Sequence, residues 1–355
     1  MPVSPSASTS SPRRIAAVGT FDGVHYGHQA VVGFLRRQAQ ARGLIPTVVT
    51  FSSHPLSVVR PERVPKSLAT LRERSHRLIE AGADDVIVIP FDARLRSLTA
   101  REFIKMLHDR YAVDAIVLGF NNSFGSDRLQ GLDEYVRISA GLGVEVLEAP
   151  GYEHPGFGTI SSTAVRHLIA AGDVASAADL LGHPFALTGP VESGKRIGRT
   201  IGFPTANLRV DSSFAIPAEG VYACRAYICD RVNDGSVDSD NMEDNSVDAC
   251  GMDDGIDGYG GCDCVAAAAP RPYYPAMVNI GRRPTVDTSS QPPLTIEAHL
   301  IGFDGDLYDR CLRLEFISRI RAEQKFPSLA ALTSQLAADK SAVLAALTTP
   351  HPANK

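Results

Sequence analysis

Two histidines near the start of the chain are the residues best suited to chemistry. His25 and His28 end the run Gly-Thr-Phe-Asp-Gly-Val-His-Tyr-Gly-His, which begins at Gly19 and follows an apolar stretch over residues 15–18. Glycines let a backbone turn tightly and approach a ligand, and a helix expected over residues 29–42 would point its N-terminal N–H groups at the same place. A lone histidine is more often structural, but in this strand–turn–helix context two imidazoles can donate to phosphate oxygens as charge builds during a transfer reaction.

A second group of polar residues precedes another expected helix, which ends near Gly172. Ser161, Ser162 and Thr163 are followed one turn later by Arg166. A hydroxyl residue at a helix start is a common N-cap, which accounts for one of the three. Three hydroxyls with an arginine indicate a second anion-binding site, because a planar guanidinium can hold a phosphate through two N–H groups.

Together, Gly-Thr-Phe-Asp-Gly-Val-His-Tyr-Gly-His and Ile-Ser-Ser-Thr-Ala-Val-Arg resemble the nucleotidyltransferase half of bacterial FAD synthetases. The resemblance implies that the phosphate of FMN attacks the α-phosphate of ATP, and that pyrophosphate leaves. His28 and Arg166 would then be catalytic, stabilising the developing charge without forming covalent bonds. The implied ATP contacts come from Gly19, Phe21, His25, His28, Ser161, Ser162, Thr163 and Arg166.

The loops that this resemblance assigns to the flavin depart from the family pattern, which is Gly-x-(Asp/Asn)-Phe-x-Phe-Gly followed by Arg and Gly. Asn121 occupies the Asp/Asn position, but Asn122 replaces a bulky residue and Ser123 follows it; Ser53 stands where a proline usually precedes His-Pro. These departures bear on acceptor affinity more than on the ATP sites. The implied flavin or FMN contacts are His54, Asn121 and Arg128, although a single loop histidine equally fits a cap of local backbone.

The second half carries four further motifs in a fixed order. They are a glycine-rich loop from Gly189 to Gly202, Phe-Pro-Thr-Ala-Asn ending at Asn207, Asn-Ile-Gly-x-x-Pro-Thr from Asn279, and Ile-Glu-Ala-His around Glu297. Turns of a β protein explain glycine spacing by themselves, but the ordered set resembles riboflavin kinase. With Gly-Val-Tyr from residue 220 and Arg-Ala-Glu-Gln-Lys-Phe from residue 321, the resemblance covers nearly the whole second half.

The resemblance to riboflavin kinase implies a division of roles. Glu297 would be the general base that accepts the proton of the ribityl 5′-hydroxyl as this oxygen attacks the γ-phosphate of ATP. Thr205 and Asn207 offer hard oxygen donors suited to Mg²⁺, and Lys195 with the glycine loop would close over the phosphates. The implied kinase ATP contacts are Gly194, Lys195, Gly198, Pro204, Thr205 and Asn207.

Elements that position the first set of motifs alternate between strand and helix. Strands are expected over residues 47–51, 85–89, 115–119 and 144–149, and helices over residues 68–81 and 100–110. Short β-branched runs separated by helical patterns predict βαβ units and a parallel sheet, whose ligands bind at the carboxyl ends of the strands. The sequence therefore predicts an α/β, Rossmann-like nucleotidyltransferase domain over residues 14–182.

Elements of the second half are short strand-like pieces divided by Gly and Pro. They are expected over residues 186–188, 220–228, 276–280, 294–301 and 312–316, followed by a helix over residues 329–347. This pattern predicts a small closed or sandwich-like β domain over residues 183–348 with a C-terminal helix. The resemblance to riboflavin kinase implies that this domain is a small antiparallel β-barrel, the riboflavin kinase domain. In the strand around Glu297, alternation places Thr295, Glu297 and His299 on one face.

One acidic segment fits no part of either family. From Asp230 to Asp263 the chain carries eleven acidic residues against the single Arg231. The whole chain has a formal charge of −5, so the remainder is positive by roughly five charges, which suits anionic nucleotides. Low hydrophobicity and high charge predict a disordered insert over residues 230–270, between two strands of the barrel. The Ser/Pro-rich residues 1–13 are expected to form a disordered tail without a signal peptide.

Composition is typical of an ordinary soluble protein, with 44% hydrophobic and 21% charged residues. No apolar run approaches the ~18 residues of a membrane span, and the six cysteines show no Cys-x-x-Cys spacing. We expect a cytoplasmic protein, a monomer or weak homo-oligomer, with small-molecule substrates and neither membrane nor nucleic-acid partners.

The predicted function is FAD biosynthesis from riboflavin, with ATP as co-substrate and Mg²⁺ as cofactor. Riboflavin would be phosphorylated to FMN, and FMN would be adenylylated to FAD. Two alternatives stay open. The first is a monofunctional kinase whose N-terminal domain is a non-catalytic nucleotide-binding module. In the second, the first domain transfers a nucleotide to a different small phosphate.

Overall fold

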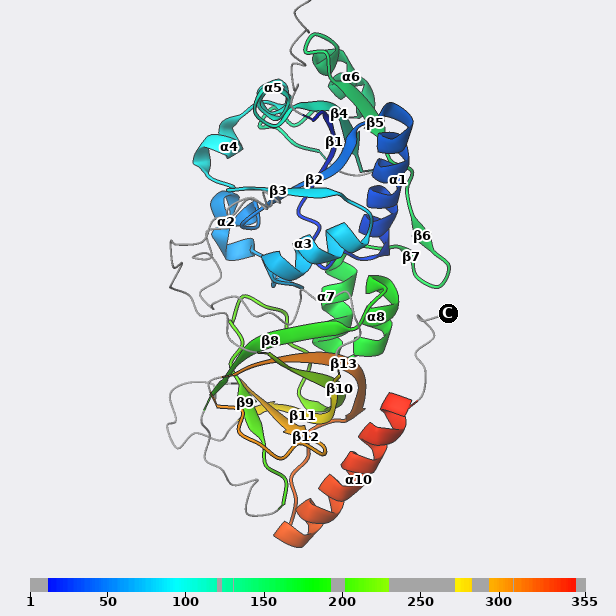
Figure 1. Ribbon diagram of the computed structural model, residues 1–355. Coiled ribbons are helices and arrows are strands. Elements are labelled where there is room, and N and C mark those ends of the chain that lie inside the picture. Colours follow the sequence, from blue (N-terminus) through cyan, green and yellow to red (C-terminus); the bar gives the residue numbers. More distant parts are fainter. Residues whose placement is uncertain are drawn as a thin grey trace, which may run out of the picture. The chain divides into compact units, whose positions relative to one another are not determined.

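The computed structural model describes residues 12–119, 123–129, 131–192, 202–229, 272–282, 294–308 and 310–348. Contacts divide the chain into two compact units, Met1–Val64 with Ser75–Glu153, and Pro65–Arg74 with His154–Lys355. Each unit is described by itself below, with the element labels of Figure 1. The predicted acidic insert and nearly all of the predicted N-terminal tail lie outside the described residues.

The first unit contains the predicted parallel sheet. Its five strands are ordered β3-β2-β1-β4-β5, and every neighbouring pair is parallel. The order reverses direction at β1, so the loops that leave β1 and β4 diverge and leave a crevice at the carboxyl edge of the sheet. The strands are β1 (Arg14–Val18), β2 (Ile45–Phe51), β3 (Asp85–Ile89), β4 (Val113–Leu118) and β5 (Glu145–Glu148).

Helices cover both faces of this sheet. α5 (Ala100–Tyr111) and α6 (Leu132–Ala140) supply Phe103, Leu107 and Tyr135 to the core on one face. α1 (Tyr26–Arg42) supplies Val32 and Leu35 to the core on the other face. The result is the three-layer α/β arrangement predicted from the alternating pattern.

Two helices begin at other residues than the sequence predicts, because capping hydrogen bonds fix where they start. α1 begins at Tyr26 and not at residue 29, because His25 is its N-cap. α3 (Leu71–Glu80) begins three residues later than predicted, because the Thr70 hydroxyl accepts a hydrogen bond from the Glu73 amide at 3.1 Å. Short elements were not predicted, since one or two turns carry no clear period. They include α2 (Leu56–Val59), η1 (Pro61–Arg63), α4 (Ala93–Ser97), β6 (Glu153–His154), β7 (Gly158–Thr159) and α8 (Val174–Leu181).

The second unit contains the predicted antiparallel barrel, which is closed in the order β10-β11-β12-β9-β8-β13. Its interior is filled by large apolar side chains, among them Phe185, Tyr222 and Phe316. α10 (Leu329–Thr348) covers part of the outer surface through Val343, which packs with Val221 and Met277. The strands are β8 (Phe185–Glu192), β9 (Ala206–Leu208), β10 (Gly220–Cys229), β11 (Tyr274–Arg282), β12 (Leu294–Leu300) and β13 (Cys311–Arg321).

Two further segments belong to the second unit by their contacts. The segment Pro65–Arg74 makes two contacts with later residues of this unit. Ser67 forms an isolated β-bridge with Phe214, and Glu73 forms a buried ion pair with Arg313. α7 (Ser162–Ala171) and α8 also group with this unit, whereas the sequence prediction assigned them to the first domain. Contacts and sequence motifs therefore divide the chain at different places.

Candidate active sites

The turn between β1 and α1 is held in an unusual backbone conformation. Phe21, Gly23 and Val24 have φ angles of 49°, 80° and 43°. Glycine adopts positive φ readily, but a β-branched valine does so at a cost, so surrounding contacts must hold it there. Val24 is 1% exposed, its amide donates to the Phe21 carbonyl at 3.1 Å, and its carbonyl accepts from the Gln29 side chain at 2.9 Å. Such pre-set geometry is typical of a ligand-binding turn.

The two histidines lie directly at the N-terminus of α1. His25 is buried, and its Nδ1 accepts a hydrogen bond from the amide of His28 at 3.3 Å. An accepting Nδ1 places the ring proton of neutral His25 on Nε2. The two rings stack at 3.7 Å between centroids, and Phe21 contacts the His28 ring edge-on at 5.2 Å. The pair is therefore held by ring contacts and by the cap bond, at a helix end whose N–H groups favour an anion.

The second polar group occupies the N-terminus of α7 in the other unit. Ser161 is the N-cap, and its hydroxyl accepts from the Ala164 amide at 3.2 Å. Ser162 and Thr163 lie in the first turn. The Arg166 Nε donates to the carbonyl of Lys66 at 2.6 Å. The Ser161 hydroxyl is thus the N-cap that the sequence pattern indicated. Ser162, Thr163 and Arg166 lie in the first two turns of the same helix.

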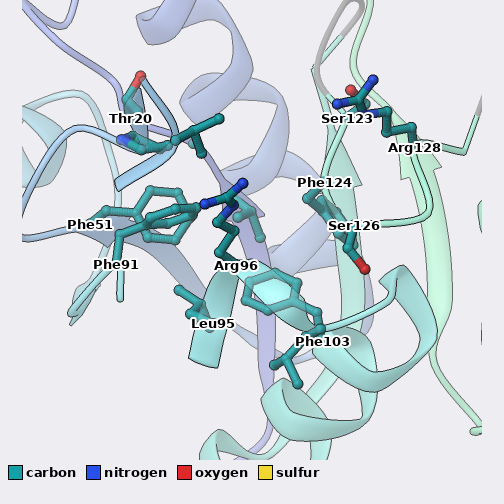
Figure 2. A pocket seen from close by; sticks show the side chains of 16 residues that line it. Thr20, Phe51, Phe91, Leu95, Arg96, Phe103, Ser123, Phe124, Ser126 and Arg128 are labelled. Atoms are coloured by element: carbon teal, nitrogen blue, oxygen red, sulfur yellow. The ribbon is translucent and has the colours of Figure 1, made fainter. Parts of the chain in front are cut away.

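A cavity of about 480 Å³ opens at the carboxyl edge of the parallel sheet (Figure 2). Its walls are largely aromatic and aliphatic, with Phe51, Phe91, Phe103 and Phe124 as the large rings. Of the described residues that line it, Arg96 and Arg128 are cationic and none is acidic. Flat apolar walls with two cations suit a planar aromatic ligand that carries negative charge.

The loop over residues 123–129 forms one wall of this cavity and is anchored to the sheet's helices. A side chain at Gly125, whose φ is 99°, would meet the Ala100 amide at 2.5 Å, so only glycine allows this approach. The Tyr135 hydroxyl accepts from the Phe124 amide at 2.8 Å and donates to its carbonyl at 2.7 Å. Burial raises the pKa of Tyr135 above its usual value, so this donor stays protonated. The Phe124 ring is thereby fixed against the cavity.

Of the predicted flavin-binding residues that the structure describes, one lines this cavity and one does not. Arg128 and Ser123 line the cavity. His54 caps local backbone, because its Nδ1 accepts from the Leu56 amide at 3.1 Å, and the adjacent Pro55 lines the cavity in its place. Asn121 and Asn122 lie outside the described residues. Sequence reasoning missed the aromatic walls and Arg96; the only available signal was that Phe51 ends β2 and Phe91 follows β3.

In the barrel, four polar side chains form a row across four neighbouring strands. Register places Asn207 opposite Glu297, Glu297 opposite Asn279, and Glu192 opposite Asn207. Residues directly opposite one another share a face, with about 4.5–5.5 Å between Cβ atoms. Both flanking residues of Glu297, Ile296 and Ala298, are buried. The row therefore lies on the outer face. Asn207 and Glu297 are predicted site residues, whereas Asn279 was not predicted to be one.

His299 connects this strand to the Phe-Pro-Thr-Ala-Asn segment. Its Nδ1 lies 2.8 Å from the carbonyl oxygen of Pro204, and Phe203 packs edge-on against its ring at 5.2 Å. Since a carbonyl only accepts, Nδ1 carries the proton. Burial lowers the pKa of His299, the bond to Pro204 opposes this shift, and Lys340 adds to the lowering. The neutral ring thus fixes Pro204 immediately before Thr205 and Asn207.

His299 predicts a pH dependence of stability. A histidine whose pKa is lowered by folding binds fewer protons in the native state than in the unfolded state, so its stabilising contribution is present above its unfolded pKa of about 6.5 and is lost as the pH falls below it. We expect the free energy of unfolding of the wild-type chain to fall between pH 7 and pH 5 more steeply than that of His299→Asn. The excess slope is at most about 1.4 kcal/mol per pH unit.

Asparagine is the matched replacement because its side-chain N–H₂ can still donate to Pro204 but does not titrate. Urea unfolding midpoints at pH 7, 6 and 5 measure the difference between the two proteins. Parallel curves would contradict the assignment of His299 as a neutral buried donor.

Three predicted kinase residues, Gly194, Lys195 and Gly198, lie outside the described residues. Pro204 and Thr205 are exposed and stand directly before β9. Within the described ranges, no group of three or more His, Cys, Asp or Glu side chains is placed to hold a metal ion.

A Rossmann-like unit with a histidine pair at a helix N-terminus, and a closed barrel with a carboxylate beside an asparagine, together define a nucleotide-dependent transferase. Comparison with known proteins agrees. The chain matches the FAD synthetase family over residues 7–164 and the riboflavin kinase family over residues 181–347. It belongs to the family of bifunctional riboflavin kinase/FMN adenylyltransferases.

Several relatives of that family cover almost the whole chain. The bifunctional riboflavin kinase/FMN adenylyltransferase of Pseudomonas fluorescens is 36% identical over 332 residues, which are 93% of this chain and 92% of the relative. That of Escherichia coli (strain K12) is 34% identical over 329 residues, covering 92% and 90%. The family and function predicted from the motifs are thus confirmed. The monofunctional alternative finds no support, because both family domains are present.

A solved structure resembles the chain along its length. A chain of Streptococcus pneumoniae described as a macrolide-efflux protein aligns with a TM-score of 0.74 and 28% identity, covering 94% of this chain and 95% of that one. Its description differs from the names of the relatives above, which agree with both family matches. No helix among the described residues combines the length and apolar character needed to span a membrane.

Proposed function

We propose that the two reactions are carried by separate sets of residues, one in each family domain. Residues 14–182 form the adenylyltransferase and residues 183–348 form the kinase. The family matches, which end at residue 164 and resume at residue 181, support this division. The enzyme acts on small molecules in the cytoplasm as a monomer or weak homo-oligomer, without nucleic-acid or membrane partners.

In the adenylyltransferase, His25 and His28 are assigned to phosphate groups of ATP. The single observation that carries this assignment is the stacked pair of imidazoles at the N-terminus of α1. Ser161, Ser162, Thr163 and Arg166 are assigned to the same nucleotide, as the family resemblance implies. An oxygen of the FMN phosphate bonds to the α-phosphorus, the bond to the β-phosphate breaks, and pyrophosphate leaves with the charge that these donors stabilise.

The cavity of Figure 2 is assigned to the flavin of the acceptor FMN. Its aromatic walls fit the flat isoalloxazine ring, and its described lining, which has two cations and no acidic side chain, suits an anionic molecule. The cavity begins at Gly19 and Thr20, which lead directly into the turn that carries the histidines. An acceptor bound there would hold its phosphate close to the nucleotide site, which is the positioning that adenylyl transfer requires.

In the kinase, Glu297 is assigned as general base. Its carboxylate takes the proton of the ribityl 5′-hydroxyl, the hydroxyl oxygen bonds to the γ-phosphorus of ATP, and ADP leaves. Asn207 and Asn279 flank the carboxylate in the row across the strands, so they can orient it or the hydroxyl. The carrying observation is that register brings Glu297 beside the Phe-Pro-Thr-Ala-Asn motif.

Thr205 and Asn207 are proposed to hold Mg²⁺. A hydroxyl and an amide oxygen beside the Glu297 carboxylate fit this hard cation, which usually keeps several waters and shares its coordination with substrate phosphates. When bound, Mg²⁺ would neutralise charge on the nucleotide phosphates.

A time course tests the proposed function. Purified protein is incubated with riboflavin, ATP and Mg²⁺, and riboflavin, FMN and FAD are separated by chromatography. FMN should appear first and then be converted to FAD. Accumulation of FMN without FAD, even when FMN and fresh ATP are supplied directly, would show that the first domain has lost or changed its acceptor.

A further inference from the structure

Arg96 is a cation in the flavin cavity that belongs to neither family motif. It lies in the five-residue helix α4, whose N-cap is Asp92. The Asp92 carboxylate accepts a hydrogen bond from the Leu95 amide at 2.7 Å. One guanidinium nitrogen donates to the carbonyl oxygen of Val58 at 3.3 Å, and within the described residues no carboxylate pairs with Arg96. A guanidinium has five N–H donors, so most of its donor capacity is available to a ligand.

The position of Arg96 identifies which part of the ligand it meets. The acceptor phosphate must reach the nucleotide, so it belongs at the end of the cavity formed by Gly19 and Thr20. The flavin ring then falls among the four phenylalanines. In Figure 2 the Arg96 side chain extends between the rings of Phe51 and Phe91 and that of Phe124. Phe51 and Phe91 contact each other edge-to-face at 5.3 Å, so the two rings form one continuous aromatic wall.

We infer that Arg96 is a specificity-determining residue for FMN adenylylation, which recognises the isoalloxazine ring and not the phosphate. This inference rests on the proposed function of the cavity. Apolar walls accept any flat ring of suitable size, whereas a fixed donor favours a ring with acceptors at its edge. The carbonyl oxygens and ring nitrogens of the flavin pyrimidine edge are such acceptors. A planar guanidinium can donate to them and also stack on an aromatic face.

Adenylylation with FMN supplied directly tests this inference. Arg96→Met should raise KM for FMN about tenfold, with kcat and KM for ATP unchanged. Lumiflavin, which has the ring without the ribityl phosphate, should inhibit the wild type competitively against FMN and should inhibit Arg96→Met about tenfold more weakly. Arg94→Met is the matched control, because Arg94 lies in the same helix but does not line the cavity; it should behave as the wild type.

Three outcomes would overturn the inference. If KM for FMN rises but the inhibition constant of lumiflavin does not change, Arg96 binds the ribityl phosphate and not the ring. If kcat falls and the melting temperature drops with KM unchanged, Arg96 only ties α4 to α2 through Val58. If Arg96→Lys restores full affinity for both ligands, a point charge suffices and the planar donor is not needed. A wild-type protein that makes no FAD from FMN would refute the proposed function instead.

Discussion

Replacing Glu297 with alanine is expected to stop the phosphorylation of riboflavin while leaving the adenylylation of FMN unchanged. General bases contribute about 10²–10⁴-fold to a rate, and register gives Glu297 a position on the outer face of β12 beside Asn207 and Asn279. Initial rates of FMN formation from riboflavin, and of FAD formation from added FMN, measure the two steps in one preparation.

Glu297→Gln separates the base from the shape of the side chain. Glutamine keeps the size and polarity of the side chain in the row across β11, β12 and β9 but cannot accept the proton, so its kinase rate should be nearly as low as that of alanine. A glutamine variant with near wild-type kinase activity would show that Glu297 positions ligands and is not the base. Unchanged FMN adenylylation in both variants verifies that the protein is folded.

Much of the fold could be predicted because its elements carry strong local signals. The strand over residues 85–89 was predicted at its observed bounds, since it is a β-branched run between polar residues and a proline. The predicted start of α1 was wrong by three residues, because His25 is the N-cap. Histidine is uncommon in that position. The three-residue strand β9 was missed, because so short a strand shows no alternation.

The candidate sites were predictable only where their residues are neighbours in the chain. His25 and His28 form one local motif, but Asn207, Asn279 and Glu297 come together through barrel closure, which sets the register between distant strands. The aromatic cavity was not predicted from the sequence for the same reason. Phe51, Phe91, Phe103 and Phe124 each come from a different segment, and each one alone reads as an ordinary core residue.

His28→Ala is expected to slow the conversion of FMN to FAD by about 10²–10³-fold, or roughly 3–4 kcal/mol in activation free energy, as for the loss of one charge-stabilising donor. The phosphorylation of riboflavin should continue at the wild-type rate. The substitution removes the ring that stacks on His25 but keeps the His28 amide, which donates to the cap. Single-turnover FAD formation with saturating ATP and FMN measures the loss.

The two histidines should therefore differ in what their removal costs. His25→Ala deletes the N-cap of α1 as well as a ring, so it should lower stability by about 0.5–2 kcal/mol in addition to any loss of activity. His28→Ala should leave the melting temperature close to that of the wild type, since its cap bond is made by backbone. Equal melting temperatures for the two variants would contradict the capping role of His25. Loss of both reactions in folded His28→Ala would contradict the assignment of the two reactions to separate sets of residues.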